Sequence, residues 1–305
     1  MNNTSTNSNK GQEKQVLGVK VNSGLDMGGV MQWVGNLLSD GNCHYITTTN
    51  AEFIMEAQKD MPFRAILNEA DLSVPDGSGV LMAIDFTDWA EKTPKSSFFI
   101  VKALIRGLSV GFRSSTRMTL ANKRVAGVEL FYEMCSYAEK NNLNVFLLGG
   151  WPKDKKGKML EVDYDLADRT AGKLRLLYPN LHIVGATSAF NPFESNDSQT
   201  VDYIKYKMKE ASVSNIDFLF VAYGHPHQEK WIKRNMCKVP AKVCMGVGGT
   251  FDYVIQTQKR SPDFYINHNL EWLYKLVTQP WRLRRIVRAF PSFPILVYLK
   301  SVKKS

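Results

Sequence analysis

The sequence has few cysteines and no long apolar run. Its 305 residues include four cysteines, and none of them stands in a CxxC or CxH spacing. That pattern argues against a disulfide framework or a zinc site and favours reduced, buried thiols in a cytosolic protein. Because no run of about 18 apolar residues occurs, we expect no segment to span a membrane.

The first residues, MNNTSTNSNKGQEK, lack the apolar segment of a signal peptide. Their polar composition predicts a disordered tail over residues 1–14.

Acidic residues are absent from the other end of the chain. From Lys275 onward there are eight Lys/Arg and no Asp/Glu, and since the net charge is +10, the preceding residues sum to +2. A local basic segment predicts an anionic partner, which could be nucleic acid, acidic lipid or a phosphate-bearing substrate.

The middle of the chain alternates short apolar runs with helical periods. Strands are expected at residues 42–50, 144–150, 181–186, 216–224 and 242–249, and residues 70–80 are expected to form a strand followed by a Pro-Asp-Gly turn. Helices are expected at 125–141, 157–177, 196–213 and 226–238. This alternation indicates βαβ units, so we predict an α/β fold with a parallel sheet and ligands at the carboxyl ends of its strands.

Two segments stand apart from this pattern. Residues 85–123 are rich in Ser, Thr, Lys and Arg and are expected to form an insertion with a short helix and a mobile loop. Near the C-terminus, Arg282, Arg285 and Arg288 recur every third residue beside an apolar stripe. Such a helix lies on an anionic membrane or packs on the body with a solvated charged face, and the pattern alone favours neither.

Glycines follow three of the expected strands, at Gly149–Gly150, Gly224 and Gly248–Gly249. One such glycine is typical of a turn, but three strand ends together favour a nucleotide or phosphate ligand that approaches the backbone closely. None of these glycines stands in GxGxxG or GxxxxGK[ST], so dinucleotide and P-loop sites are disfavoured.

Carboxylates and histidines offer weaker signals. Asp76 follows a proline, which is typical of a turn, and would act as a general base only beside an acceptor hydroxyl. Asp163 and Asp165 open a polar helical stretch and are interpreted as a solvated helix face. His225 and His227 lack an evident third ligand, so a metal site there is the less favoured interpretation.

The chain resembles a known family in a series of ordered motifs. These are TTN followed by AEF, then ADLSVPDGSGV, KRVAGVELF, VFLLGG, DFLFVAYGHPHQEKWI, GVGGTFDYVIQTQKRSP and LEWLYKLVTQPWRLRR. Together they resemble the WecG/TagA/CpsF family of bacterial glycosyltransferases over roughly residues 15–290. Residues 85–123 are longer than the family's usual link between its motifs.

The resemblance implies a sugar transfer at the cytoplasmic face of the membrane. Such enzymes move a sugar, often N-acetylmannosamine or its uronic acid, from a UDP donor to a polyprenyl-diphosphate-linked sugar, for cell-surface polysaccharide or teichoic acid synthesis. The reaction inverts the anomeric centre and uses neither metal nor cofactor. The implied architecture is a Rossmann-like body (15–262) and a basic, helical, membrane-associating appendage (263–305), which makes the protein peripheral on the inner face.

The resemblance also implies roles for individual residues. Asp76 matches the general base, and it shares a pocket with Thr48, Asn50, Arg124 and Gln228. The donor side corresponds to Asp252 and the glycines Gly149, Gly150, Gly224, Gly248 and Gly249. The acceptor diphosphate and the membrane surface correspond to Lys275, Arg282, Arg285 and Arg288.

Two other functions stay open. One is a metal-dependent hydrolase built on His225 and His227, and the other is a non-catalytic module that binds nucleotide sugars. A nucleic-acid partner is disfavoured because the basic segment lacks regularly interleaved aromatic residues.

Overall fold

The structure is a computed structural model of the whole chain. It describes residues 11–107, 109, 125–151, 164–255, 262, 264–265, 271–278, 283 and 287–303, apart from the side chains of residues 271, 272 and 275.

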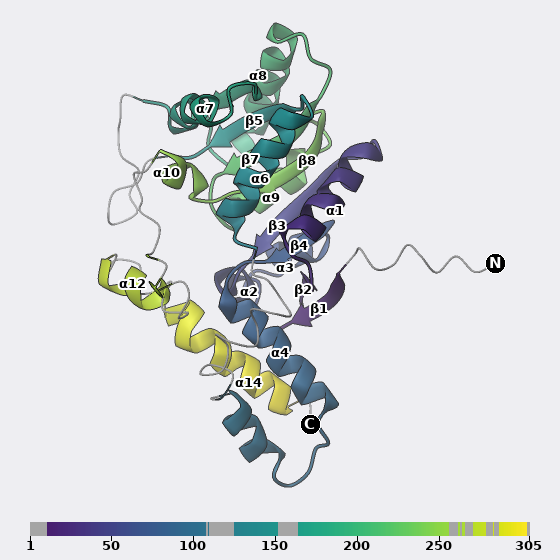
Figure 1. Cartoon of the computed structure of the whole chain (residues 1–305), viewed down its shortest axis with the longest axis vertical. Coiled ribbons are helices and arrows are strands. Elements are labelled where there is room, and N and C mark those ends of the chain that lie inside the picture. The colour runs from purple at the N-terminus through teal and green to yellow at the C-terminus, as the bar shows by residue number, and fades with distance from the viewer. Residues whose placement is uncertain are drawn as a thin grey trace, which may run out of the picture.

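A six-stranded parallel sheet forms the centre of the upper part of the molecule (Figure 1). Its strand order is β4-β3-β8-β7-β5-β6. The strands are β3 (His44–Thr49), β4 (Leu72–Pro75), β5 (Asn144–Gly149), β6 (His182–Thr187), β7 (Ile216–Ala222) and β8 (Ala241–Gly246). The predicted α/β fold with a parallel sheet is therefore confirmed.

The central strands are apolar because both faces of the sheet are covered. In β7, Phe218 and Phe220 pack into the hydrophobic core on one face, whereas Leu219 and Val221 pack into the core on the other. Parallel sheets are buried in this way because their crossover helices lie on both faces, which explains a continuous apolar run in the sequence.

Helices cover each face of the sheet. One face packs against α1 (Met27–Ser39), α6 (Gly127–Lys140), α7 (Leu166–Leu177) and α10 (Thr250–Val254). The other packs against α3 (Met61–Asn68), α8 (Asp197–Glu210) and α9 (His227–Asn235). A 3-10 turn, η1 (Glu194–Asn196), leads into α8.

The interpretation of Asp165 as a solvated helix residue is wrong. Its carboxylate caps α7 by accepting a hydrogen bond from the Asp168 N–H at 3.0 Å, and it also accepts one from the Ser188 N–H at 2.6 Å. A side chain that satisfies two backbone donors fixes the start of the helix beside the end of β6. Asp163, and the part of the expected helix that precedes Tyr164, lie outside the described residues.

A second hydrophobic core is formed mainly by elements that lie below the sheet in Figure 1. Its buried side chains come from the two-stranded sheet of β1 (Gln12–Val16) and β2 (Val19–Ser23), α2 (Ala51–Glu56), α3, α4 (Ser78–Lys92), the helical residues 99–107 and α14 (Phe293–Lys303). We call this the lower core. It joins the two ends of the chain, since Phe293 and Val297 of α14 are buried with valines of the hairpin.

The lower core adjusts two predicted boundaries. The strand β1 begins inside the predicted tail of residues 1–14. Its residues pair with β2, and Val16, Val19 and Val21 of this hairpin are buried in the lower core. The predicted insertion, residues 85–123, begins within α4, whose Phe86 and Ala90 are buried in the lower core. Residues 108 and 110–124 lie outside the described residues.

Candidate functional site

A cavity of about 630 Å³ opens at the carboxyl ends of the parallel strands. Its walls come from the segments that follow β3, β4, β5, β7 and β8, and from the starts of α6 and α9. Ligands bind at this edge of open α/β sheets because the loops diverge there and the helix N-termini favour anions.

Ten of the predicted site residues line this cavity. They are Thr48, Asn50, Asp76, Gly150, Gly224, Gln228, Gly248, Gly249, Asp252 and Arg288. Gly149 is the last residue of β5 and directly precedes the lining residue Gly150. Arg124, Arg282 and Arg285 lie outside the described residues, as does the side chain of Lys275.

Two turns form one wall of the cavity, and we call them the glycine turns. The first comprises residues 223–227 after β7, and the second residues 247–249 after β8. Gly224 and Gly248 have φ angles of 78° and 54°, a region that favours glycine. The first turn also contains a cis peptide bond between His225 and Pro226.

Gln228 joins the two glycine turns. Its side-chain oxygen accepts hydrogen bonds from the Gly224 N–H at 3.0 Å and from the Gly248 N–H at 2.9 Å. The side chain is almost fully buried, with 2% of the residue exposed. Gln228 therefore fixes the shape of this wall, and its position at the start of α9 lets one side chain reach both turns.

Glu229 sets the orientation of the Gln228 amide. The Gln228 Nε2 donates to the Glu229 Oε1 at 2.6 Å, which directs the amide oxygen toward the two glycine N–H groups. Burial raises the pKa of the Glu229 carboxyl to about 7, although the hydrogen bond from Gln228 opposes this shift. Sequence reasoning interpreted Glu229 as a helix-start residue, and no local pattern reveals this contact.

Gly246 makes room for the pair. A Cβ atom at this position would lie 2.5 Å from the Gln228 Nε2 and 2.9 Å from the Glu229 Oε1. Both distances are far below van der Waals contact, so only glycine at the end of β8 allows the two side chains to lie against the strand.

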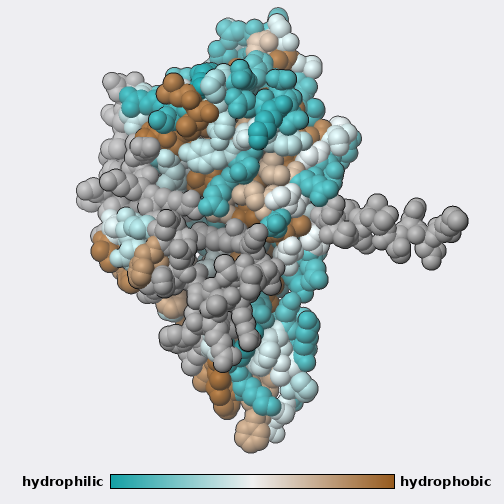
Figure 2. Space-filling model, in the orientation of Figure 1, coloured by the Kyte–Doolittle hydropathy of each residue, from teal (hydrophilic) through white to brown (hydrophobic). Residues whose placement is uncertain are grey.

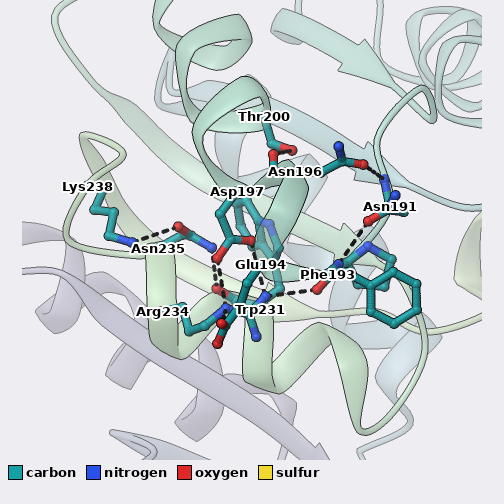
Figure 3. A network of polar contacts seen from close by, with 11 residues as sticks. Asn191, Phe193, Glu194, Asn196, Asp197, Thr200, Trp231, Arg234, Asn235 and Lys238 are labelled. Carbon is teal, nitrogen blue, oxygen red and sulfur yellow. Dashed lines mark hydrogen bonds and ion pairs between the residues drawn. The ribbon is translucent and has the colours of Figure 1, made fainter.

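The helix α9 is anchored to two neighbouring helices, α3 and α8. Arg234 forms a two-pronged ion pair with Asp197 at the start of α8, at 2.7 and 3.1 Å, and also donates to the Pro192 carbonyl (Figure 3). Lys230, one turn earlier in α9, pairs with Asp60 at the start of α3 at 2.5 Å. These contacts, together with the fully buried Trp231, hold the helix that carries Gln228.

Another part of the cavity lining contains Thr48, Asn50 and Asp76. Asn50 caps α2 by accepting a hydrogen bond from the Phe53 N–H at 3.0 Å. Thr48 lies against the start of α6, where a Cβ atom on Gly127 would be 3.1 Å from the Thr48 Oγ1. Asp76 directly follows β4, and its N–H donates to the Thr49 carbonyl at 2.9 Å, which ties the residue to the neighbouring strand.

Aromatic and acidic side chains complete the cavity lining. Trp151 and Tyr223 lie together with ring centroids 5.7 Å apart, and the Trp151 Nε1 donates to the Ser188 carbonyl. Among the described lining residues, the carboxylates are Glu52, Glu56, Asp76 and Asp252 and the only Lys or Arg is Arg288. A bound diphosphate therefore needs further positive charge, in addition to the helix N-termini.

Arg288 belongs to the C-terminal segment. It begins η3 (Arg288–Ser292), just before α14, and its guanidinium pairs with Glu56 of α2 at 3.0 Å. Both partners are partly exposed, at 49% and 26% of their side chains. This ion pair brings the C-terminal segment to the cavity.

The two cavity histidines contact protein groups on separate elements. The His225 Nε2 lies 3.8 Å from Glu52, and its ring packs 4.8 Å from Phe53, whereas His227 packs against Phe193. Within the described residues, no group of three or more His, Cys, Asp or Glu side chains could hold a metal ion. The hydrolase alternative thus finds no third ligand in the part of the chain that the structure describes.

Comparisons with known proteins identify the family to which this chain belongs. The chain matches the Glycosyl transferase WecG/TagA/CpsF family over residues 14–106 and 103–305. This chain belongs to that family. It is therefore a glycosyltransferase, and the match covers both the sheet and the C-terminal helices.

Two curated relatives carry the same name, N-acetylglucosaminyldiphosphoundecaprenol N-acetyl-beta-D-mannosaminyltransferase. The protein of Bacillus subtilis (strain 168) is 28% identical over 259 residues, covering 85% of this chain and 80% of the relative. The protein of Bacillus spizizenii (strain ATCC 23059 / NRRL B-14472 / W23) is 28% identical over 243 residues, covering 80% and 74%.

Proposed function

We propose that this glycosyltransferase moves N-acetylmannosamine, or a closely related sugar, from a UDP donor to a sugar on a polyprenyl diphosphate. The names of the relatives support the sugar and the lipid-linked acceptor. The observation that carries the proposal is the cavity itself, which places Asp76 among the same lining residues as the glycine turns and Arg288.

The donor diphosphate is assigned to the space between the glycine turns and the N-terminus of α6. That N-terminus, at Gly127 and Val128 beside Thr48, lines the cavity, and its first N–H groups have no partner within the helix and can bind an anion. Asp252 is assigned to the uracil. Positive charge from Arg124 and from the basic C-terminal residues would stabilise the leaving UDP without a metal.

Asp76 is assigned as the general base. The acceptor hydroxyl must lose a proton as its oxygen attacks the anomeric carbon, and a carboxylate on the side opposite the leaving group can accept it. Direct displacement by that hydroxyl inverts the configuration at the anomeric carbon. Thr48 and Asn50 flank the same position and are assigned to holding the acceptor sugar.

The acceptor diphosphate is assigned to Arg288 and to Lys275, Arg282 and Arg285. No helix among the described residues is long and apolar enough to cross a membrane. We therefore place the enzyme peripherally, on the inner face of the cell membrane, with its basic C-terminal segment against anionic lipid.

Donor profiling tests this proposal. The purified chain is supplied with a short-chain lipid diphosphate bearing N-acetylglucosamine and with a panel of UDP-sugars, and the product is identified by mass. We expect one added N-acetylhexosamine, an inverted linkage by NMR and unchanged activity in chelator. Turnover that requires zinc or manganese would instead favour the hydrolase alternative, and donor binding without any product would favour the non-catalytic module.

A further inference from the structure

Residues 98–105, at the start of the helical residues 99–107, expose several large apolar side chains. Phe98, Ile100, Val101, Leu104 and Ile105 are exposed at 70%, 57%, 54%, 52% and 62%. We call these five residues the apolar tip. Figure 2 shows hydrophobic residues, drawn brown, at the lower end of the molecule. Contiguous exposed apolar side chains mark a surface that contacts a partner or a membrane.

The apolar tip is held in place by the lower core. Phe99 and Ala103 are buried there, and the Phe99 ring stacks on Trp89 with centroids 6.0 Å apart. Arg106 pairs with Asp85 of α4 at 2.7 Å. Phe98 lies in the turn before this helix, and the other four exposed side chains lie on the helix itself. The helix packs on α4 through its buried residues, and the tip side chains stay exposed in the part of the chain that the structure describes.

The tip adjoins the C-terminal segment. The Tyr298 hydroxyl of α14 donates to the Ile100 carbonyl at 3.3 Å, and α14 itself exposes Ile295 and Leu299. Since α14 follows directly from η3, which begins with the cavity residue Arg288, one continuous segment leads from the apolar tip to the cavity.

Charge distinguishes a lipid from a protein partner. Residues 92–107 contain Lys92, Lys95, Lys102 and Arg106 and no acidic residue. Large apolar side chains between basic ones match the interface of an anionic bilayer, where the apolar groups enter the acyl region and the cations lie at the headgroups.

We propose that the apolar tip is a membrane-contact surface that inserts into an anionic bilayer and orients the cavity toward a lipid-linked acceptor. The proposal that the tip orients the cavity rests on the proposed function, whereas the proposal that the tip inserts into the bilayer does not. A second copy of the chain is the competing occupant, and it would bury the same side chains without lipid.

Vesicle binding of the full chain tests the proposal. Vesicles of phosphatidylcholine, with or without phosphatidylglycerol, are sedimented with wild type and with the double variant Val101→Gln/Ile105→Gln. We expect the double variant to bind anionic vesicles about tenfold more weakly or worse, because two apolar side chains no longer leave water. The matched control is Leu176→Gln/Leu177→Gln on α7, where the two leucines are exposed at 76% and 49%. This control variant should bind vesicles as wild type does.

Transfer assays separate this proposal from the proposed function. With a short-chain acceptor in solution, the double variant should transfer sugar at the wild-type rate. With a long-chain acceptor in vesicles, its transfer rate should fall about tenfold, because its vesicle binding falls by about the same factor. A chain that transfers no sugar in either assay contradicts the proposed function and leaves the vesicle result standing. The proposal would be overturned if wild type and the double variant bound vesicles equally well. It would also be overturned if wild type were a dimer that the variant converted to a monomer without loss of vesicle binding.

Discussion

The two sides of the cavity are held by very different contacts. The glycine turns are joined by the buried side chain of Gln228, whose oxygen accepts from two backbone N–H groups. The C-terminal segment meets the cavity through the partly exposed pair of Arg288 and Glu56. Buried hydrogen bonds fix geometry, whereas exposed ion pairs contribute little to stability. Under the proposed assignment, the donor side is therefore preformed, whereas the acceptor side can adapt to its substrate.

Removing the Gln228 amide should have the largest effect on the preformed side. In Gln228→Leu both glycine N–H groups lose their partner, and Glu229 loses its donor. We expect the free energy of unfolding to fall by about 3 kcal/mol and transfer to fall at least about 100-fold. Denaturant melts and initial rates measure the two effects. Gln199→Leu, at an exposed position on α8, is the control and should leave both unchanged.

Protonation of Glu229 gives the next largest effect. Its pKa is about 7 in the folded protein against 4.5 ordinarily, so the folded state holds the proton more tightly. The stability that comes from this carboxyl is complete below pH 4.5 and is lost as the pH rises through 7, by about 3 kcal/mol at most.

The matched variant for this prediction is Glu229→Gln, which keeps the shape of the side chain and cannot ionise. Unfolding free energies are measured for both proteins from pH 4.5 to 8. We expect wild type to lose stability relative to the variant across that range. Two parallel pH profiles would show that Glu229 does not titrate in this range.

A methyl group at Gly246 should have a moderate effect. The Cβ atom of Gly246→Ala would press on the Gln228 amide, so we expect a loss of about 2 kcal/mol and a higher KM for the donor. Gly172→Ala in α7 is the control, since its Cβ atom would meet nothing within 4 Å and a helix interior favours alanine. If both variants melt alike, Gly246 is not needed for close packing.

The exposed pair should matter least to stability. Arg288→Gln and Glu56→Gln each break the same ion pair, and each should change the free energy of unfolding by less than about 1 kcal/mol. If Arg288 contacts the acceptor diphosphate, only Arg288→Gln should raise the acceptor KM, by about tenfold. Equal KM values for the two variants would remove Arg288 from the acceptor site.

The sheet could be predicted from the sequence because its signals are local. The apolar run 216–224 corresponds to β7 (Ile216–Ala222), and 144–150 corresponds to β5 (Asn144–Gly149). Each run carries its own length and its own glycine stop, and burial on both faces makes it uniformly apolar. No local sequence pattern predicted the lower core, because its contacts join β1 and β2 to α14, which is far from them in sequence.

Ten of the residues named from the sequence line one cavity, but the contacts among them were not predicted. Glycines after strands indicated a ligand edge, and the family motifs indicated Asp76 and Gln228. The link from Gln228 to Gly248 spans 20 residues of sequence and exists only because β7 and β8 are neighbours. The same is true of the Glu229 carboxyl, whose raised pKa depends on burial that no local pattern encodes.

The most direct test of the account is the transfer rate of Asp76→Asn in a single turnover, with UDP-N-acetylmannosamine and a short-chain lipid diphosphate bearing N-acetylglucosamine. Asp202→Asn, at an exposed position on α8, serves as the matched control. If Asp76 takes the acceptor proton, its variant slows transfer at least about 100-fold with little change in donor affinity, and the control transfers as wild type does. Equal rates for wild type and Asp76→Asn would contradict the assignment of this cavity as the site of transfer.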